Sequence, residues 1–290
     1  MKKILVFSLI AFLTAFVAVA QEDSTQTKSL PVRSPFESGL LIDNQTVVIP
    51  TAKTLEFLIQ HRFGTIENGI TDLYGIYAAG ANVRLGLNYS LFDNLMIGFG
   101  TTKNKKMQDF QAKWNVFPQT RDNKFPVALT LYGNMAIDCR SKTVFEDSYK
   151  FSNRFSYFGQ LIIARKINDM ISIQVAPGFT HYNAVDTLSD HDKISVSFTG
   201  RVKVSPQSSI MLQYDLPLKI KGISEHTSFN NPSKPNAAIA WEISTSTHSF
   251  QIYLGTAVGI IPQEIMMYNQ NDFLDGQLML GFTITRLWSF

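Results

Sequence analysis

The residues of this sequence that could do catalytic or metal chemistry are its histidines, serines and acidic side chains. The histidines include no i,i+4 pair and no His-x-His motif, and the one cysteine, Cys139, stands alone. Zinc sites need such ligand spacings, so a metal centre has no support. No Gly-x-Ser-x-Gly elbow presents a serine nucleophile to a histidine base. We therefore expect neither an enzyme nor a cofactor. The five histidines are His61, His181, His191, His226 and His248.

Two groups with acidic residues fall in or directly beside the outer loops of the strands predicted below. They are Asn68-Gly69 with Asp72, and Asp186 with Asp190-His191-Asp192. Loop carboxylates could bind a cation, but no EF-hand spacing is present. Solvated loop carboxylates are far more common than calcium sites, and we predict no metal there.

The beginning of the chain has the order of a secretory signal peptide. Basic residues precede an apolar stretch from Ile4 to Val17, and small residues precede the polar run that begins at Gln21. The stretch is shorter than the roughly 20 residues of a membrane helix, so a retained anchor is the less favoured alternative. We predict a signal peptide over residues 1–20, cleaved after Ala20, and therefore an exported protein.

The composition of the remaining chain limits the class of protein. Without the signal peptide, 24 basic residues face 23 acidic ones, so nucleic acid is not expected as a partner. A single cysteine cannot form an internal disulfide. No later stretch could form a membrane helix, so any membrane span must consist of strands. The 22 phenylalanines and 10 tyrosines, with only 17% charged residues, favour strands as well.

Apolar and polar residues alternate from about Thr54 to the last residue, which is the pattern of strands with two different faces. In the clearest run, Ile194, Val196 and Phe198 interleave with Ser195 and Ser197. Marking every run predicts about twelve strands, and most reach the roughly 9–11 residues that cross a bilayer. The predicted strands are 54–63, 79–91, 95–102, 107–117, 125–138, 154–167, 171–183, 192–204, 208–219, 236–246, 248–259 and 277–290.

The joins between these strands alternate in length, apart from 103–106 and 118–124. Outer-membrane barrels have short periplasmic turns and longer external loops, so alternation follows if both chain ends lie in the periplasm. The long joins are 64–78, 139–153, 220–235 and 260–276, and the short ones are 92–94, 168–170, 205–207 and residue 247.

The last predicted strand carries a further signal. Its apolar face ends on Trp288 and Phe290. This resembles the C-terminal signature by which the barrel-assembly machinery recognises outer-membrane barrels. Arg286 interrupts the face, but a long cationic side chain near the membrane edge can extend to the headgroups.

Residues 21–53 differ in kind from the rest of the chain. The segment is polar as far as Ser29 and carries apolar residues between Pro35 and Pro50. We interpret it as a periplasmic N-terminal extension or plug segment. A plug in the barrel, a cover over its periplasmic mouth and an added short strand all remain open.

Alternation does not say which face lies inside, because a soluble barrel turns its apolar face inward and a membrane barrel turns it outward. A barrel of about twelve strands is wider than the eight-stranded kind that side chains fill. The charged face suits a wet interior, so residues 54–290 are predicted to form a single antiparallel transmembrane β-barrel in the outer membrane. The alternative is a secreted soluble β-protein. On the outward face we expect an aromatic girdle that includes Tyr89, Trp114, Tyr214, Trp241 and Trp288.

The charges on the predicted inner face are the most informative functional feature. With Lys166 and Lys219 added to the candidates below, seven basic residues face four acidic ones. Rings of charge set ion preference in pores, so we hypothesise a small cation-excluding bias. The alternative is a neutralising network that braces the wall and closes the pore. The lumen-facing charged candidates are Glu56, Arg62, Arg84, Lys113, Asp138, Arg201, Lys203, Asp215 and Glu242.

Several stretches together resemble an uncharacterised family of Bacteroidetes outer-membrane β-barrel proteins, a domain of unknown function. They are residues 55–64, 81–87, 97–100, 242–245, 248–251 and 281–286. The resemblance covers roughly residues 33–290 and implies barrel and location, but no activity and no catalytic residues. The polar positions that it points to are Glu56, His61, Arg62, Arg84, Glu242 and Arg286.

We therefore expect a passive outer-membrane pore or channel for small solutes, whose partners are outer-membrane lipid, the barrel-assembly machinery and those solutes. The alternative is a closed structural or partner-binding barrel that presents loops 139–153, 220–235 and 260–276. Liposome swelling separates the two, because only a pore admits solutes.

Overall fold

The computed structural model describes residues 29–145, 149–186, 189–220 and 232–290. The predicted signal peptide and His226 lie outside these residues. Within them, no helix is long and apolar enough to cross a membrane.

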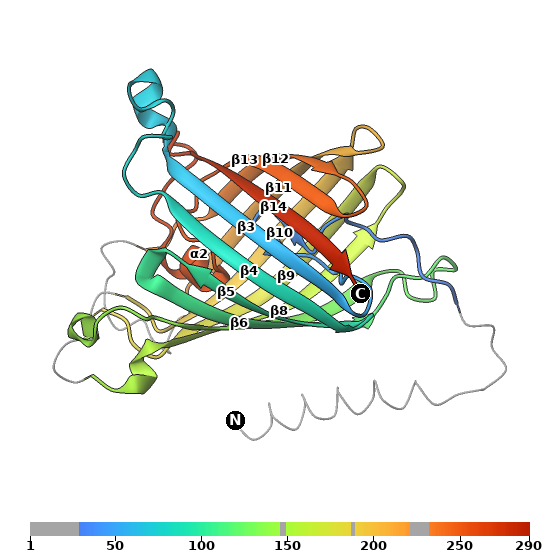
Figure 1. The fold of residues 1–290 in the computed structure, drawn as a ribbon, viewed down its shortest axis with the longest axis horizontal. Helices are drawn as coiled ribbons and strands as arrows, with labels where there is room; N and C mark the ends of the chain where they lie inside the picture. Colours follow the sequence, from blue (N-terminus) through green and yellow to red (C-terminus); the bar gives the residue numbers. More distant parts are fainter. Residues whose placement is uncertain (1–28, 146–148, 187–188, 221–231) are drawn as a thin grey trace. The chain divides into compact units, whose positions relative to one another are not determined.

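Twelve antiparallel strands close into one barrel, which confirms the predicted fold class (Figure 1). Each strand pairs with its neighbours in the chain, and the last pairs with the first. β5 and β6 have the predicted bounds, and each of the other strands has at least one end that differs from the prediction by one to four residues. The strands are β3 (Thr54–Thr65), β4 (Asn82–Phe92), β5 (Leu95–Thr102), β6 (Met107–Phe117), β7 (Ala128–Ile137), β8 (Phe155–Lys166), β9 (Ile171–Tyr182), β10 (Asp192–Lys203), β11 (Ser208–Leu218), β12 (Asn236–Ser244), β13 (His248–Gly255) and β14 (Met279–Ser289).

The barrel closes between its first and last strands. β14 pairs with β3 along the whole seam, from Met279 opposite Thr65 to Ser289 opposite Thr54. The Phe290 amide donates to the Lys53 carbonyl at 3.2 Å. The beginning of the barrel domain and its last residue are therefore held together.

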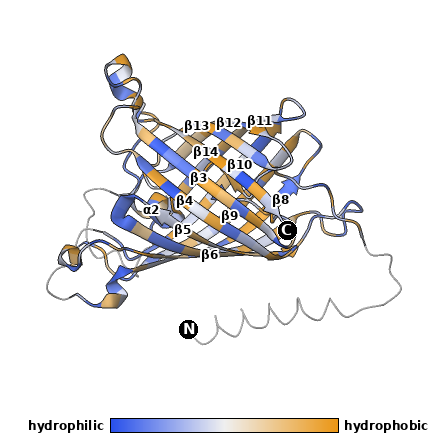
Figure 2. Cartoon of the chain, in the orientation of Figure 1, coloured by the Kyte–Doolittle hydropathy of each residue, from blue (hydrophilic) through white to orange (hydrophobic). Residues whose placement is uncertain are grey.

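The two faces of the wall have the polarity of a membrane barrel. On β10, Phe198 and Ile194 point outward and are more than two-fifths exposed, whereas Ser195 and Ser197 point inward and are fully buried. Figure 2 shows this alternation as bands of opposite hydropathy along the strands. Apolar side chains toward lipid and polar ones toward an enclosed centre are the arrangement of outer-membrane barrels.

The connections are short at one end of the barrel and longer at the other. The β4–β5 turn is two residues long, whereas the β3–β4 connection carries the 3₁₀ helix η2 (Ile66–Asp72). The β5–β6 connection, residues 103–106, carries η3 (Asn104–Lys106) and is short although it lies at the end with the longer connections. The β7–β8 connection carries η4 (Lys142–Phe145) and η5 (Phe151–Arg154). The β6–β7 connection is long although it lies at the end with the short turns. It pairs with the N-terminal segment through Pro31 opposite Thr120.

Two further elements belong to the barrel unit but not to its wall. β1 (Leu40–Leu41) and β2 (Asn44–Gln45) form a hairpin of their own. α2 (Pro262–Tyr268) interrupts the β13–β14 connection, where the sequence predicts an external loop. Proline at the start of α2 suits the first turn of a helix, because that position needs no amide donor.

Candidate functional site: the occupied lumen

The inner face of the wall is polar along most strands, and glycines make room for its larger side chains. Gly98 and Gly100 of β5 face inward, and a Cβ at Gly100 would overlap the guanidinium of Arg84 on β4. Arg84 donates from Nε and Nη2 to the two carboxylate oxygens of Asp109, at 2.9 and 2.6 Å. Both partners are buried, so the arginine and the glycines form one packed unit.

The other deep charges of the wall have polar partners too. Arg201 donates to Glu242 at 3.1 Å. Glu56 accepts from Asn88 at 2.6 Å. Asp215 accepts from three amide side chains, those of Asn44, Gln213 and Asn236, at 2.6 to 2.8 Å. Charges buried in this way are tolerable because each has hydrogen-bonding partners.

The N-terminal segment lies inside this wall and binds it through backbone groups. The tip of its hairpin is Ile42-Asp43, and the side chains from Leu40 to Val47 are all buried. Gln251 of β13 accepts from the Ile42 amide at 3.0 Å and donates to the Leu40 carbonyl at 2.9 Å. We call residues 36–47 the lumen segment.

Wall residues of four strands hold the remainder of the lumen segment. Lys113 of β6 donates to the Gly39 carbonyl at 3.0 Å, and Gln174 of β9 donates to the Gln45 carbonyl at 2.8 Å. Gln213 of β11 accepts from the Asp43 amide at 3.0 Å. Arg201 of β10 lies 3.4 Å from the Glu37 carboxylate. The segment is thus connected around most of the circumference.

Arg62 joins the lumen segment to the β13–β14 connection. Its guanidinium pairs with Asp43 and donates to the carbonyls of Ala257 and Gly259. The ring of Tyr253 packs against it, with Arg62 Cζ 5.7 Å from the ring centroid. Because Arg62 is only 1% exposed, these partners replace the water that an arginine normally binds.

α2 fills the lumen at the end that carries the long connections. Gln263 donates to Asn134 at 2.7 Å, and Glu264 accepts from Asn104 at 3.0 Å and lies 3.5 Å from Lys105. Burial raises the pKa of Glu264, against the lowering effect of Lys105 and Asn104. Burial likewise lowers the pKa of Lys105. α2 is therefore docked by polar contacts that involve an incompletely compensated carboxyl group.

One side of the lumen is apolar, which the alternation of the strands does not predict. Apolar side chains of the lumen segment cluster with inward-facing residues of the wall and with Met266 of α2. The lumen segment is thus amphipathic, with polar contacts on one side and a small apolar core on the other. The cluster includes Phe36, Leu41, Ile42, Val47, Tyr132, Phe158, Ile162, Met211 and Tyr253.

Between the lumen segment and the residues that lead into α2, a cavity of about 10 Å³ remains. Leu40, Asp43, Arg84, Tyr132 and Ile261 are among its lining residues. Such a volume holds about one water molecule. The two segments therefore meet almost without a gap along this part of the lumen.

The structure places most charged candidates deep in the lumen and two at its edges. Asp138 follows β7 and pairs with Arg140 at 2.6 Å, and Lys203 ends β10 with its ammonium 3.7 Å from Glu37. Lys219 lies beyond the end of β11. Lys193 of β10 is buried as well and pairs with Asp190 at 2.9 Å. The buried charges of the wall strands are Arg62, Arg84, Lys113, Lys193 and Arg201 against Glu56, Asp109, Asp215 and Glu242.

The excess of basic residues on which the predicted cation-excluding bias rests is smaller in the structure, because the wall strands carry five buried basic and four buried acidic side chains. Asp109 has the same inward parity as Lys113 in the sequence and could have been counted. Asp43 and Glu37 could not have been assigned to the lumen from the sequence, since their segment shows no alternation. The expectation that residues 260–276 form a loop presented to partners fails for 260–261 and 263–267, which are buried.

Three other polar positions singled out in the sequence lie outside the lumen. The His61 ring stacks on Phe282, with centroids 5.2 Å apart. Arg286 contacts Thr247 and His248 at the β12–β13 turn, so its charge is satisfied at the edge of the barrel. His181 pairs with Asp192 at 2.6 Å. Among the described residues, no three histidine, cysteine or acidic side chains are grouped to hold a metal ion.

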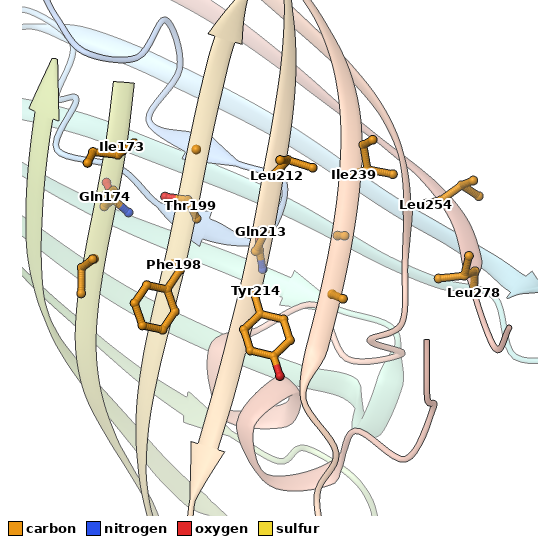
Figure 3. Close-up of a pocket in the computed structure, with 14 residues that line it drawn as sticks. Ile173, Gln174, Phe198, Thr199, Leu212, Gln213, Tyr214, Ile239, Leu254 and Leu278 are labelled. Atoms are coloured by element: carbon orange, nitrogen blue, oxygen red, sulfur yellow. The ribbon is translucent and has the colours of Figure 1, made fainter. Parts of the chain in front are cut away.

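The lipid-facing surface carries an apolar groove of about 690 Å³ across β9 to β13 (Figure 3). Gly200 and Ala237 leave space between larger outward side chains such as Phe198, Leu212 and Tyr214. The groove is on the opposite side of the wall from the lumen and belongs to the surface that lipid covers. Tyr89, Trp114, Tyr214, Trp241 and Trp288 are all exposed on this outer surface, where the girdle is expected.

The family model for a membrane bound beta barrel domain (DUF5777) matches residues 36–288. The chain belongs to this family. The match begins at Phe36, so the family's domain includes the lumen segment as well as the wall. A search of curated proteins gives no match.

Solved structures share the barrel with this member of the family. The COG4313 outer membrane channel from Pseudomonas putida F1 is 12% identical, with a TM-score of 0.52, over 83% of this chain and 97% of that one. The NanC porin is 7% identical, with a TM-score of 0.49, over 81% of this chain and 99% of that one. At such identities the likeness concerns the fold alone. Family and fold together make this protein an outer-membrane β-barrel.

Proposed function

We propose that this protein is a channel for small polar solutes whose lumen is closed in this conformation. The observation that carries the proposal is the kind of closure. Two segments that are not part of the wall, the lumen segment and α2, fill the lumen. Both are attached to the rest of the barrel by hydrogen bonds and ion pairs.

The polar character of these contacts supports a closed channel rather than a permanently solid barrel. Wall amides such as Gln174, Gln213 and Gln251 exchange protein partners for water at a small net cost, because a hydrogen bond to water replaces the one lost. Displacing the segments would leave a lumen lined largely by polar groups. The apolar cluster opposes displacement, and its limited size sets the stability of the closed state.

The alternative, a closed structural barrel, is favoured by the pairing of charges around Arg62, Arg84 and Arg201. Buried networks of this kind can brace a wall without any transport. The two functions differ in what happens when the lumen segment is removed.

The deciding experiment compares the full chain with a variant that lacks residues 31–49, reconstituted in planar bilayers and liposomes. A channel gives rare openings in the full chain, steady conductance in the variant, and liposome swelling in small polar solutes. Replacing the exposed turn around Gly69 with glycine and serine serves as control, because it changes an outer connection and no lumen contact.

Folding of the variant is checked by its heat-dependent mobility in gels and by its β-sheet circular dichroism. A folded variant that passes neither ions nor solutes would overturn the channel and leave the structural barrel.

A further inference from the structure

The wall recognises the lumen segment mainly through groups that any peptide possesses. Gln251 makes a pair of contacts with one stretch of backbone, accepting from Ile42 N–H and donating to the Leu40 carbonyl. Gln213 accepts from Asp43 N–H, and Gln174 donates to the Gln45 carbonyl. Amide side chains complement a peptide backbone because each offers one acceptor and donors side by side.

The hairpin of the segment carries one charged side chain, Asp43, and the wall recognises it by an ion pair. The Asp43 carboxylate binds Arg62, a residue of the wall itself, and both groups are buried. Charge-assisted hydrogen bonds of this kind are stronger than neutral ones and select carboxylates. The neighbouring Leu41 and Ile42 belong to the apolar cluster that also contains Met211 and Tyr253 of the wall.

We propose that the wall site formed by Arg62, Gln174, Gln213 and Gln251 binds the transported solute, and that this solute is a short peptide with an acidic residue next to an apolar one. The inference rests on the proposed channel. The lumen segment occupies the site as an internal substitute for the solute, so the solute and the segment compete. Uncharged sugars of similar size lack both the carboxylate and the regular backbone amides, and they bind weakly.

The test measures binding separately from conduction, in protein that folds with its own segment in place. A protease site inserted next to the exposed Thr51 allows the chain to be cut after purification, which detaches the lumen segment from β3. The probe is a fluorescent peptide with the sequence of residues 40–45, Leu-Leu-Ile-Asp-Asn-Gln, acetylated and amidated. Its anisotropy is measured with the cut protein in detergent, beside a version with asparagine in place of aspartate.

We expect the acidic peptide to bind at least about tenfold more tightly than the asparagine version, because only the former pairs with Arg62. Arg62→Gln removes this preference. Gln251→Ala weakens the binding of both peptides by a similar factor, since Gln251 hydrogen-bonds to the backbone, which the two peptides share. Lys142→Gln, the same change of charge in an exposed loop, alters neither affinity.

An acidic dipeptide such as acetyl-Ile-Asp-amide should displace the probe, and maltotriose should not. Equal binding of the acidic and neutral peptides, or equal competition by the sugar, would overturn the inference even if the channel conducts. Absence of any conductance in the variant that lacks residues 31–49, with selective peptide binding intact, would refute transport and leave a peptide-binding barrel.

Discussion

Asp43→Asn tests how the lumen segment is held, because it removes one charge and keeps the shape of the side chain. The backbone amide of residue 43 still donates to Gln213. Arg62 loses its carboxylate partner and keeps the carbonyls of Ala257 and Gly259. The guanidinium is then buried beside neutral acceptors only.

The size of the effect follows from that burial. Removing one partner of a buried ion pair costs about 3–5 kcal/mol, because the other charge remains uncompensated. Since two carbonyls still accept from Arg62, the lower value, about 3 kcal/mol, is appropriate. At roughly 1.4 kcal/mol per factor of ten, the ratio of displaced to seated segment rises about 150-fold.

Single-channel recording measures this ratio as open probability. Asp275→Asn is the matched control, since Asp275 is an exposed loop residue whose carboxylate lies 3.9 Å from Lys234. An open probability for Asp43→Asn within twofold of that of the unmodified protein would show that the Asp43–Arg62 pair does not hold the segment in the lumen.

Three further outcomes are expected. Burial raises the pKa of Glu264 above its usual 4.5, so docked α2 binds a proton that undocked α2 releases. Docking of α2 is therefore stabilised as the pH falls through the raised pKa toward 4.5. Channel openings should be rarer at about pH 5 than at about pH 8. Glu264→Gln should abolish this dependence, and a dependence that persists would exclude Glu264 as its source. Gly100→Ala pushes a Cβ into the Arg84 guanidinium and should lower the free energy of unfolding, measured in urea from vesicles, by about 1–3 kcal/mol. Gly200→Ala, with no atom within 4 Å of its Cβ, should change it by less than about 0.5 kcal/mol. Equal losses of stability in the two variants would contradict the overlap at Gly100. Deleting Phe290 should slow assembly of heat-stable barrel by the assembly machinery, and an unchanged rate would remove the terminal aromatic from the signature.

The wall could be predicted from the sequence because alternation is a local property. In β10 and β4, each residue's side follows from its neighbours, and the strand bounds differ from the prediction by only a few residues. The outward polarity needed one more argument, the width of a barrel of twelve strands. Strands with less regular alternation depart from this pattern. β8 turns Phe158 and Ile162 inward, so the lumen is not uniformly polar.

The occupied lumen could not be predicted, because it depends on contacts between residues far apart in the chain. The lumen segment is too short and too irregular to show a period, and its partners lie on six strands or more. α2 has only seven residues, fewer than periodicity can identify. The one available signal was apolar composition between Pro35 and Pro50, which is compatible with a plug, a cover or a strand.

The seam between β3 and β14 determines the order of events during biogenesis. The sheet cannot become a cylinder until the final strand has been synthesised and delivered, because that strand supplies half of the closing ladder. The lumen segment, being attached directly ahead of β3, travels beside one of the two edges that must meet. An open, curved sheet can therefore wrap around it, and no threading through a completed ring is required.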